Sequence, residues 1–475
     1  MLFHTIEFAI FLPIVWLAYW ATFRSPRVRT CILLLASWTF YAAWDVRFLS
    51  LLVGSTALDY FCGVALGSTD DPVRRRRLAA LSVAGNLGLL GTFKYYDFFA
   101  SSFAAMLARV GLDVAPWTLE VLLPVGISFY TFQTLGTTLD VYRRRVQPEP
   151  DPILYAAYVA FFPQLVAGPI ERAERLLPQL RSPRPFAWRD QLDGLLIFAV
   201  GLAQKVVIAD RLAPLVDQTF AARPGELVAA DVLIGSWAFA FQIFGDFSGY
   251  TDMAIGSAML FGVRLTDNFR GPYLAANPQE FWRRWHVSLS SWLRDHLYVP
   301  LGGGRGSKWL TARNLLLTMV LGGLWHGAAW TFVLWGAAHG LWLLLHRALV
   351  GVLARVGGMG AAWRWPLRIL GVAVTFQLVC FTWILFRAED LAAASLQFGA
   401  LGNPGFGPDQ WAKLQWLFRF AWLGVVIQGV QYRWPEQLRG GAARGVLVVL
   451  AVYAISRSLA DGAFADDRPF IYFQF

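Results

Sequence analysis

Long apolar stretches separated by short polar turns run through almost the whole chain. A straight membrane-crossing helix needs about 20 apolar residues. Apolar segments lie near 6–23, 30–44, 48–67, 78–98, 119–140, 153–169, 192–209, 227–245, 251–263, 314–326, 329–349, 368–386, 415–431 and 444–460. Several are too short for a straight crossing, and several contain Pro, Gly, Asp or His. We therefore expect some to be broken or re-entrant, because irregular backbone at membrane depth must lie inside protein or beside water.

The composition supports a membrane protein. Hydrophobic residues make up 57% of the 475 residues and charged residues 15%, whereas soluble domains carry about 25% charged residues. Intrinsic disorder is excluded, because disordered chains have low hydrophobicity. The pattern predicts an all-α polytopic integral membrane protein with roughly 11–13 transmembrane helices plus re-entrant and interfacial helices. We expect one membrane domain over 1–475, with its motifs at about 120–350 and C-terminal helices within 365–465.

The distribution of charge predicts an orientation. The chain carries 41 Lys and Arg against 31 Asp and Glu, a net charge of +10. In a membrane protein such an excess marks cytoplasmic loops rather than a nucleic-acid partner. Arginines gather at 24–29, 74–77 and 143–145, which share one face if each intervening segment crosses once. That face should be cytoplasmic, so the N-terminus should be periplasmic, on a first span that is retained because no signal-cleavage pattern follows it.

The segment 153–169 breaks this alternation. Arginines 143–145 precede it and further arginines follow it within 172–184, so both flanks favour the cytoplasm. The segment contains Pro163 and a Gly168-Pro169 turn. These features predict a re-entrant hairpin, and two ordinary crossings are the alternative.

Five of the six histidines fall between 286 and 346, and His326 is the unusual one. Apolar residues flank it for more than ten positions on each side, and an ionisable residue at such a place indicates function. A low dielectric favours the neutral imidazole, which is the form that a general base needs. The alternative is a structural histidine that is hydrogen-bonded between helices.

The other histidines do not form a metal-binding pattern. His339 and His346 are seven residues apart on one expected helix, a rise of about 10.5 Å, which is too far for one ion. The three cysteines are far apart in apolar runs. We predict that the protein has no metal site and that His339 and His346 are dispensable for chemistry.

Two polar segments stand out from the apolar pattern. The first is 277–306, where Asn277-Pro278 predicts a helix start and tryptophans and arginines follow. We interpret it as a functional segment, and a plain interfacial helix without a functional role is the alternative. Its glycine-rich turn at 302–306 is not a phosphate-binding P-loop, because no Gly-Lys-Ser/Thr follows. In 245–252 two carboxylates stand six residues apart. The glycines there predict a broken helix, and we interpret the carboxylates as part of a structural polar network rather than as a hydrolase pair.

An ordered set of motifs covers nearly the whole chain: FLP at 11–13, FYAAWDVRFL at 40–49, FKYYDFF at 93–99, PVGISFYTFQTLGTTLDVYR at 124–143, FFPQLVAGPIER at 161–172, DFSGYTDMAIG at 246–256, FWRRWHVSLSSWLRDHLYVPLGG at 281–303, GLWHG at 323–327 and FIYFQF at 470–475. Each motif alone is weak evidence of a protein family, but the set in this order is specific to one. It resembles the membrane-bound O-acyltransferases, in particular the bacterial branch that O-acetylates secreted polysaccharides such as alginate.

The resemblance implies a ring of tilted helices around a central tunnel, with the family's signature histidine at His326 and the second motif histidine at His286. It implies transfer of an acetyl group from cytosolic acetyl-CoA across the membrane. His326 would be the general base, because a hydroxyl is a poor nucleophile until a base takes its proton. His286 would orient the donor or polarise its carbonyl. D-alanyl transfer to teichoic acid on the same fold is the second hypothesis, and a non-enzymatic transporter is the third.

The phosphates of coenzyme A predict a basic entrance on the cytoplasmic side. The candidate contacts are Arg283, Arg284, Arg294, Arg305 and Lys308. Contact of these residues with lipid headgroups alone is the alternative. The resemblance also implies a bacterial inner-membrane location and no permanently bound cofactor. A periplasmic acetyltransferase partner and a polysaccharide acceptor, reached directly or by relay, are the expected partners.

Overall fold

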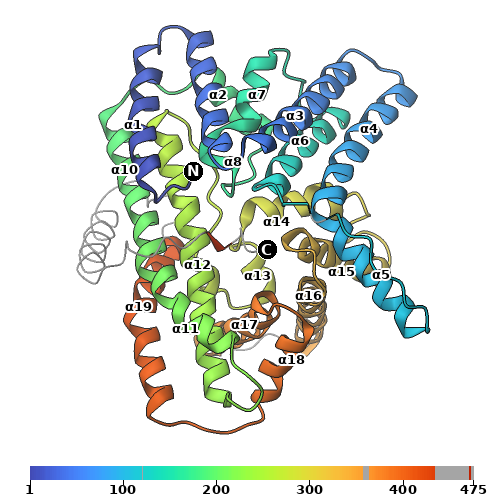
Figure 1. Ribbon diagram of the computed structural model, residues 1–475, viewed down its shortest axis with the longest axis vertical. Helices are drawn as coiled ribbons and strands as arrows, with labels where there is room; N and C mark the ends of the chain where they lie inside the picture. Colours follow the sequence, from blue (N-terminus) through green and yellow to red (C-terminus); the bar gives the residue numbers. More distant parts are fainter. Residues whose placement is uncertain (120, 357–362, 434–469, 472–475) are drawn as a thin grey trace. The chain divides into compact units, whose positions relative to one another are not determined.

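The computed structural model describes residues 1–119, 121–356, 363–433 and 470–471, and all regular elements within these ranges are helices (Figure 1). The predicted all-helical class is confirmed. The predicted apolar segment 444–460 lies outside the described residues. The contacts divide the chain into two compact units, Met1–Phe198 with Met253–Thr266 and Ala199–Asp252 with Asp267–Phe475.

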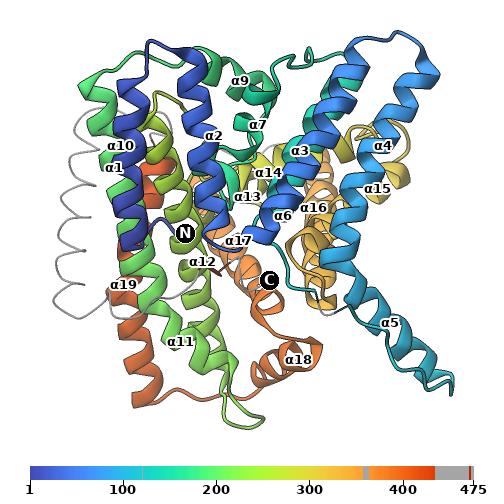
Figure 2. The same cartoon turned by 45° about the horizontal axis from the view of Figure 1, so that its top comes forward.

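The first unit begins with a series of helices. They are α1 (Ile6–Ala21), α2 (Pro26–Ala42), α3 (Val46–Gly67), α4 (Pro72–Leu90), the π-helical turn η1 (Gly91–Tyr95), α5 (Tyr96–Arg109), α6 (Ile127–Tyr142), α7 (Pro152–Ala160), α8 (Phe162–Leu165) and α9 (Ala173–Arg181). Parts of α10 (Trp188–Ala203) and α12 (Ala229–Leu260) complete it. Helices α3, α4 and α6 lie side by side (Figures 1 and 2).

A buried polar network joins α3, α4 and α6. The carboxylate of Asp59 on α3 accepts hydrogen bonds from the Ser82 hydroxyl, from Asn86 Nδ2 at 2.7 Å and from Thr138 Oγ1 at 2.8 Å. Asp59 is fully buried. Because each of these donors comes from a neighbouring helix, the network fixes the register of the three helices while satisfying a carboxylate inside the bundle.

The predicted break within 153–169 is confirmed. Helix α7 has 9 residues and α8 has 4, and Phe161 between them adopts a non-helical conformation. At 1.5 Å per residue, α7 is about 14 Å long, well short of the ~30 Å of a bilayer core. Neither piece is long enough to cross a membrane alone, and the re-entrant hairpin itself stays a prediction.

The second unit carries the remaining elements. They are the π-helical turn η2 (Gln204–Ala209), α11 (Asp210–Phe220), the 3-10 turn η3 (Pro272–Leu274), α13 (Pro278–Trp282), α14 (Val287–Leu293), the π-helical turn η4 (Arg294–Tyr298), α15 (Lys308–His326), α16 (Trp330–Val356), α17 (Arg364–Arg387), α18 (Leu391–Ala400) and α19 (Pro408–Arg433). Across the described residues of both units, four helical stretches are long and apolar enough to cross a membrane: Val46–Gly67, Trp188–Phe220, Trp330–Val352 and Arg364–Arg387.

The prediction of a broken helix at 245–252 is wrong, because α12 runs through this segment without interruption. Its glycines serve close packing instead. A Cβ at Gly249 would lie 2.6 Å from the Gly201 carbonyl oxygen, and one at Gly245 would lie 3.0 Å from the Gln204 carbonyl oxygen. The interpretation of the carboxylates as a polar network is confirmed, since Asp246 pairs with Lys205 and Asp252 accepts a hydrogen bond from Gln204.

Helices α15 and α16 form a tight hairpin in which the two backbones touch at glycine residues. A Cβ at Gly323 would lie 2.2 Å from the Phe332 carbonyl oxygen, and one at Gly336 would lie 2.3 Å from the Met319 carbonyl oxygen. Only glycine permits this approach at both positions. The hairpin therefore sets the position of the side chains that α15 and α16 carry near their connection.

We predict opposite effects for two Gly→Ala substitutions on α16. Gly351 has open space around its Cβ position, so Gly351→Ala should be neutral or stabilise by up to about 1 kcal/mol, as expected in a helix interior. Gly336→Ala should destabilise by roughly 1–3 kcal/mol, because a methyl group would meet the backbone of α15. Thermal unfolding of both variants in detergent measures the difference. A Gly336→Ala protein as stable as the Gly351→Ala protein would contradict the backbone contact.

Candidate active site

His326 is the last residue of α15 and is enclosed by aromatic rings. It is 4% exposed. Its ring centroid lies 5.0 Å from that of Trp325, 5.1 Å from that of Trp335 on α16 and 5.3 Å from that of Phe386 on α17. Because these contacts come from three helices, the imidazole has a defined position in the second unit.

His286 lies on the turn between α13 and α14, in a left-handed conformation with φ +43° and ψ 56°. This conformation is uncommon for a residue other than glycine and costs about 1–3 kcal/mol, so the surroundings must enforce it. Asn268 does so: its carbonyl oxygen accepts the Val287 N–H at 3.0 Å, and its side-chain oxygen accepts the Ser288 N–H at 3.1 Å. Strained residues of this kind cluster at functional sites.

The structure brings the two predicted histidines together, although 40 positions separate them in the chain. The ring centroids of His286 and His326 are 6.5 Å apart, and Trp325 and Phe247 also pack on His286. Burial lowers the pKa of His286 to about 3. His286 is therefore neutral at physiological pH, so its ring can donate one hydrogen bond and accept another but cannot supply a positive charge.

The two described residues of the C-terminal motif lie against the same cluster. The ring of Phe470 contacts Phe247, with 5.9 Å between the ring centroids, and the Ile471 N–H donates to the Asp246 carboxylate. The other oxygen of Asp246 lies 3.2 Å from Lys205 Nζ. Residues 470–471 are therefore anchored to α12, next to the phenylalanine that supports His286.

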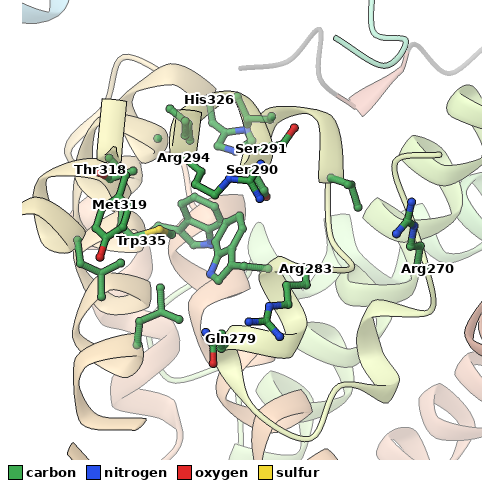
Figure 3. A pocket seen from close by; sticks show the side chains of 18 residues that line it. Arg270, Gln279, Arg283, Ser290, Ser291, Arg294, Thr318, Met319, His326 and Trp335 are labelled. Carbon is green, nitrogen blue, oxygen red and sulfur yellow. The ribbon is translucent and has the colours of Figure 1, made fainter. Parts of the chain in front are cut away.

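A cavity of about 600 Å³ opens beside His326 (Figure 3). Its lining includes apolar and aromatic side chains such as Met319, Trp282 and Trp335. The polar and charged side chains of the lining are Gln279, Ser290, Ser291, Thr318, Arg270, Arg283 and Arg294. The three arginines are exposed. The cavity has the size of a small-molecule site and combines an apolar interior with a few polar groups, as such sites usually do.

The five basic residues that the sequence predicts as contacts of the donor lie in different surroundings. Arg283 and Arg294 line the cavity. Arg284 forms an ion pair with Glu280 at 3.0 Å and lies over the ring of Tyr432. The two remaining residues, Arg305 and Lys308, are exposed near the start of α15 and are not among the lining residues.

Sequence reasoning missed Arg270 as a cavity residue. It precedes the arginine-rich motif by more than ten positions, and no pattern in the sequence connects it to that motif. The fold joins them, because the Arg270 N–H donates to the Arg284 carbonyl oxygen at 3.1 Å. This contact places Arg270 beside the same cavity as Arg283 and Arg294.

His339 lies on α16 among the rings that surround the site. Its Nε2 is 3.1 Å from the Thr382 hydroxyl oxygen, and its ring stacks on Phe281. These contacts give it a packing role between α16 and α17. Its dispensability for chemistry stays a prediction.

The chain is similar to known membrane acyltransferases. The model of the membrane-bound O-acyltransferase (MBOAT) family matches residues 138–386, a range that contains His286 and His326. The chain is 42% identical over 407 residues to the probable alginate O-acetylase AlgI of Pseudomonas aeruginosa, covering 85% of this chain and 75% of that protein. It is 38% identical over 424 residues to the peptidoglycan O-acetyltransferase of Helicobacter pylori (83% and 78%). It is 26% identical over 279 residues to the teichoic acid D-alanyltransferase of Bacillus subtilis (56% and 69%).

The lowered pKa of His286 predicts how stability depends on pH. The folded-state pKa of His286, about 3, lies below the ordinary value of 6.5. The contribution of His286 to the free energy of unfolding is therefore fully present above pH 6.5. It is lost as the pH falls from 6.5 towards 3, by at most about 1.4 kcal/mol per pH unit. His286→Asn, which tolerates the left-handed backbone, should lose stability less steeply than the wild type between pH 7 and 5. Equal slopes in pH-resolved unfolding experiments would refute this prediction.

Proposed function

Because the chain belongs to the membrane-bound O-acyltransferase family, we propose that it transfers an acetyl group from cytosolic acetyl-CoA across the membrane to O-acetylate a secreted polysaccharide such as alginate. One observation carries the proposal: a buried histidine and three exposed arginines line the same cavity. Two of the similar proteins support acetyl as the transferred group: the probable alginate O-acetylase matches at 42% identity and the peptidoglycan O-acetyltransferase at 38%, each over more than four fifths of the chain.

In the proposed reaction His326 is the general base. The acceptor hydroxyl oxygen attacks the thioester carbonyl carbon while its proton passes to the neutral imidazole of His326. The carbonyl π electrons move to oxygen and form a tetrahedral oxyanion. When this intermediate collapses, the carbon–sulfur bond breaks and the coenzyme A thiolate takes the proton from His326. The products are the O-acetyl ester and free coenzyme A.

We assign His286 a positioning role in this reaction. Its ring lies 6.5 Å from that of His326, it is fully buried, and it is neutral. A neutral imidazole can donate one hydrogen bond that orients the donor or polarises its carbonyl. The strained turn held by Asn268 supports this assignment, because strained residues of this kind cluster at functional sites.

The arginines of the cavity suit the donor's phosphates. Arg270, Arg283 and Arg294 present guanidinium groups that pair with phosphate oxygens in a forked geometry. We place this entrance on the cytoplasmic side, where acetyl-CoA is found. Arg284, Arg305 and Lys308 remain predicted contacts of the donor or of lipid headgroups.

Transfer of D-alanine is the less supported alternative, because the teichoic acid D-alanyltransferase matches at 26% identity over 56% of this chain. The proposed setting is the bacterial inner membrane with the N-terminus in the periplasm. A periplasmic acetyltransferase partner would carry the acetyl group onward unless the polysaccharide reaches the cavity itself.

We predict that His326→Ala abolishes acetyl transfer. Removal of a general base costs about 10²–10⁴-fold in rate. His339→Ala is the matched control, since His339 is also a buried histidine within the same aromatic surroundings. Transfer of labelled acetyl from acetyl-CoA should be lost in the first variant and retained in the second, with both proteins inserted normally. A His326→Ala protein that keeps more than about a tenth of the wild-type rate would refute the general-base role.

We also predict that loss of a phosphate contact weakens binding of the donor alone. Arg283→Ala and Arg294→Ala should each raise the KM for acetyl-CoA by roughly three- to thirtyfold and leave kcat unchanged, because the contact is equal in the ground and transition states. Arg364→Ala is the control, as Arg364 is exposed at the start of α17 and is not a cavity residue. Steady-state kinetics over a range of acetyl-CoA concentrations measures all three. Altered abundance with an unchanged KM would instead indicate contact with lipid.

A further inference from the structure

The proposed reaction requires a hydrogen-bond donor for the oxyanion, and Trp335 has the properties of that donor. Its side chain is 1% exposed, and it lines the cavity beside His326 (Figure 3). Among the residues that the structure describes, its indole Nε1 has no hydrogen-bond partner. An indole N–H can only donate, and a buried donor without an acceptor is costly, so this group is suited to a bound acceptor atom.

The position of Trp335 relative to His326 is set by the helix hairpin. Gly336, the next residue on α16, lies against the backbone of Met319 on α15. The indole therefore packs on the imidazole of His326, with 5.1 Å between ring centroids and 84° between ring planes. A hydroxyl that loses its proton to His326 would attack a carbonyl within reach of the same two rings.

The surrounding rings hold the indole in one orientation. Trp383 stacks on it at 5.9 Å between centroids, and Phe386 and His339 contact it at 5.3 and 4.8 Å. The Nε1 of Trp383 in the same cluster already donates to the Tyr273 hydroxyl at 3.2 Å. Trp335 thus differs from its stacking neighbour in having an N–H that is still available.

We propose that the indole Nε1–H of Trp335 donates a hydrogen bond to the oxyanion formed during acetyl transfer. The inference rests on the proposed function. In the step concerned, the new carbon–oxygen bond forms, the carbonyl π electrons move to oxygen, and the acceptor's proton moves to His326. Trp335 keeps its own proton and stabilises the negative oxygen. A donor held in place by aromatic rings is effective here, because it needs no reorganisation when the charge develops.

Trp335→Phe tests the proposal, because phenylalanine keeps an aromatic ring and removes the N–H. We expect kcat to fall by about 100-fold or more, as for removal of one oxyanion donor. The KM for acetyl-CoA should stay within about threefold of the wild-type value, because the bond strengthens only in the transition state. A role in packing alone would lower thermal stability without separating kcat from KM in this way.

Trp285→Phe is the matched control. Trp285 is fully buried, and its Nε1 also lacks a partner among the described residues. Its ring contacts Trp383 of the same aromatic cluster, with 5.1 Å between ring centroids, and it does not line the cavity. Its kcat should stay near that of the wild type. An equal loss of kcat in both variants would overturn the proposal, since a general disturbance of the cluster would then explain the effect.

Two further outcomes separate the possible failures. Trp282 also lines the cavity with a partnerless Nε1 among the described residues. A large loss of kcat in Trp282→Phe with near wild-type kcat in Trp335→Phe would assign the donor to Trp282 and overturn the proposal for Trp335. A wild-type protein that is folded but transfers no label from acetyl-CoA would refute the proposed function, independently of the role of Trp335.

Discussion

The direct contact between the backbones of α15 and α16 is the constraint on which the site depends. Gly323 and Gly336 allow the two helices to approach until carbonyl oxygens occupy the space that side chains would otherwise fill. The same contact brings His326, at the end of α15, against Trp335 on α16. A wider spacing would move the proposed general base and the proposed hydrogen-bond donor apart, and catalysis is sensitive to displacements of about 1 Å. In the proposed reaction the two glycines would therefore affect the chemistry through packing.

Buried polar groups in both units are held by specific partners rather than left to solvent. In the first unit Asp59 receives three side-chain hydrogen bonds, and in the second Lys205 lies between Asp246 and Asp210. Such satisfied networks specify one packing arrangement of helices that apolar contacts alone would fix poorly. His286 is the strained member of this set, and Asn268 supplies the hydrogen bonds that keep its turn in place.

The cavity in the second unit is lined by both charged and uncharged side chains. The arginines of the cavity are exposed, whereas the rings around His326 are aromatic and uncharged. This arrangement suits the proposed acyl donor, whose phosphates would pair with the arginines while its thioester lies among the aromatic rings. Among those rings the proposed general base and the proposed hydrogen-bond donor would be more effective than they are in water.

The sequence by itself determined the class of fold, the irregular segment within 153–169, the helix start at Asn277 and the positions of the two motif histidines. These follow from local patterns: apolar length, turn residues, a capping side chain and an ordered set of motifs. Tertiary structure alone decided the rest. The glycines at 245 and 249 predicted a break, but a neighbouring helix segment uses them for close contact, which a single segment cannot reveal. Likewise, only contacts between separate segments of the chain distinguish Arg283 from Arg284, add Arg270 and bring the indole of Trp335 against His326.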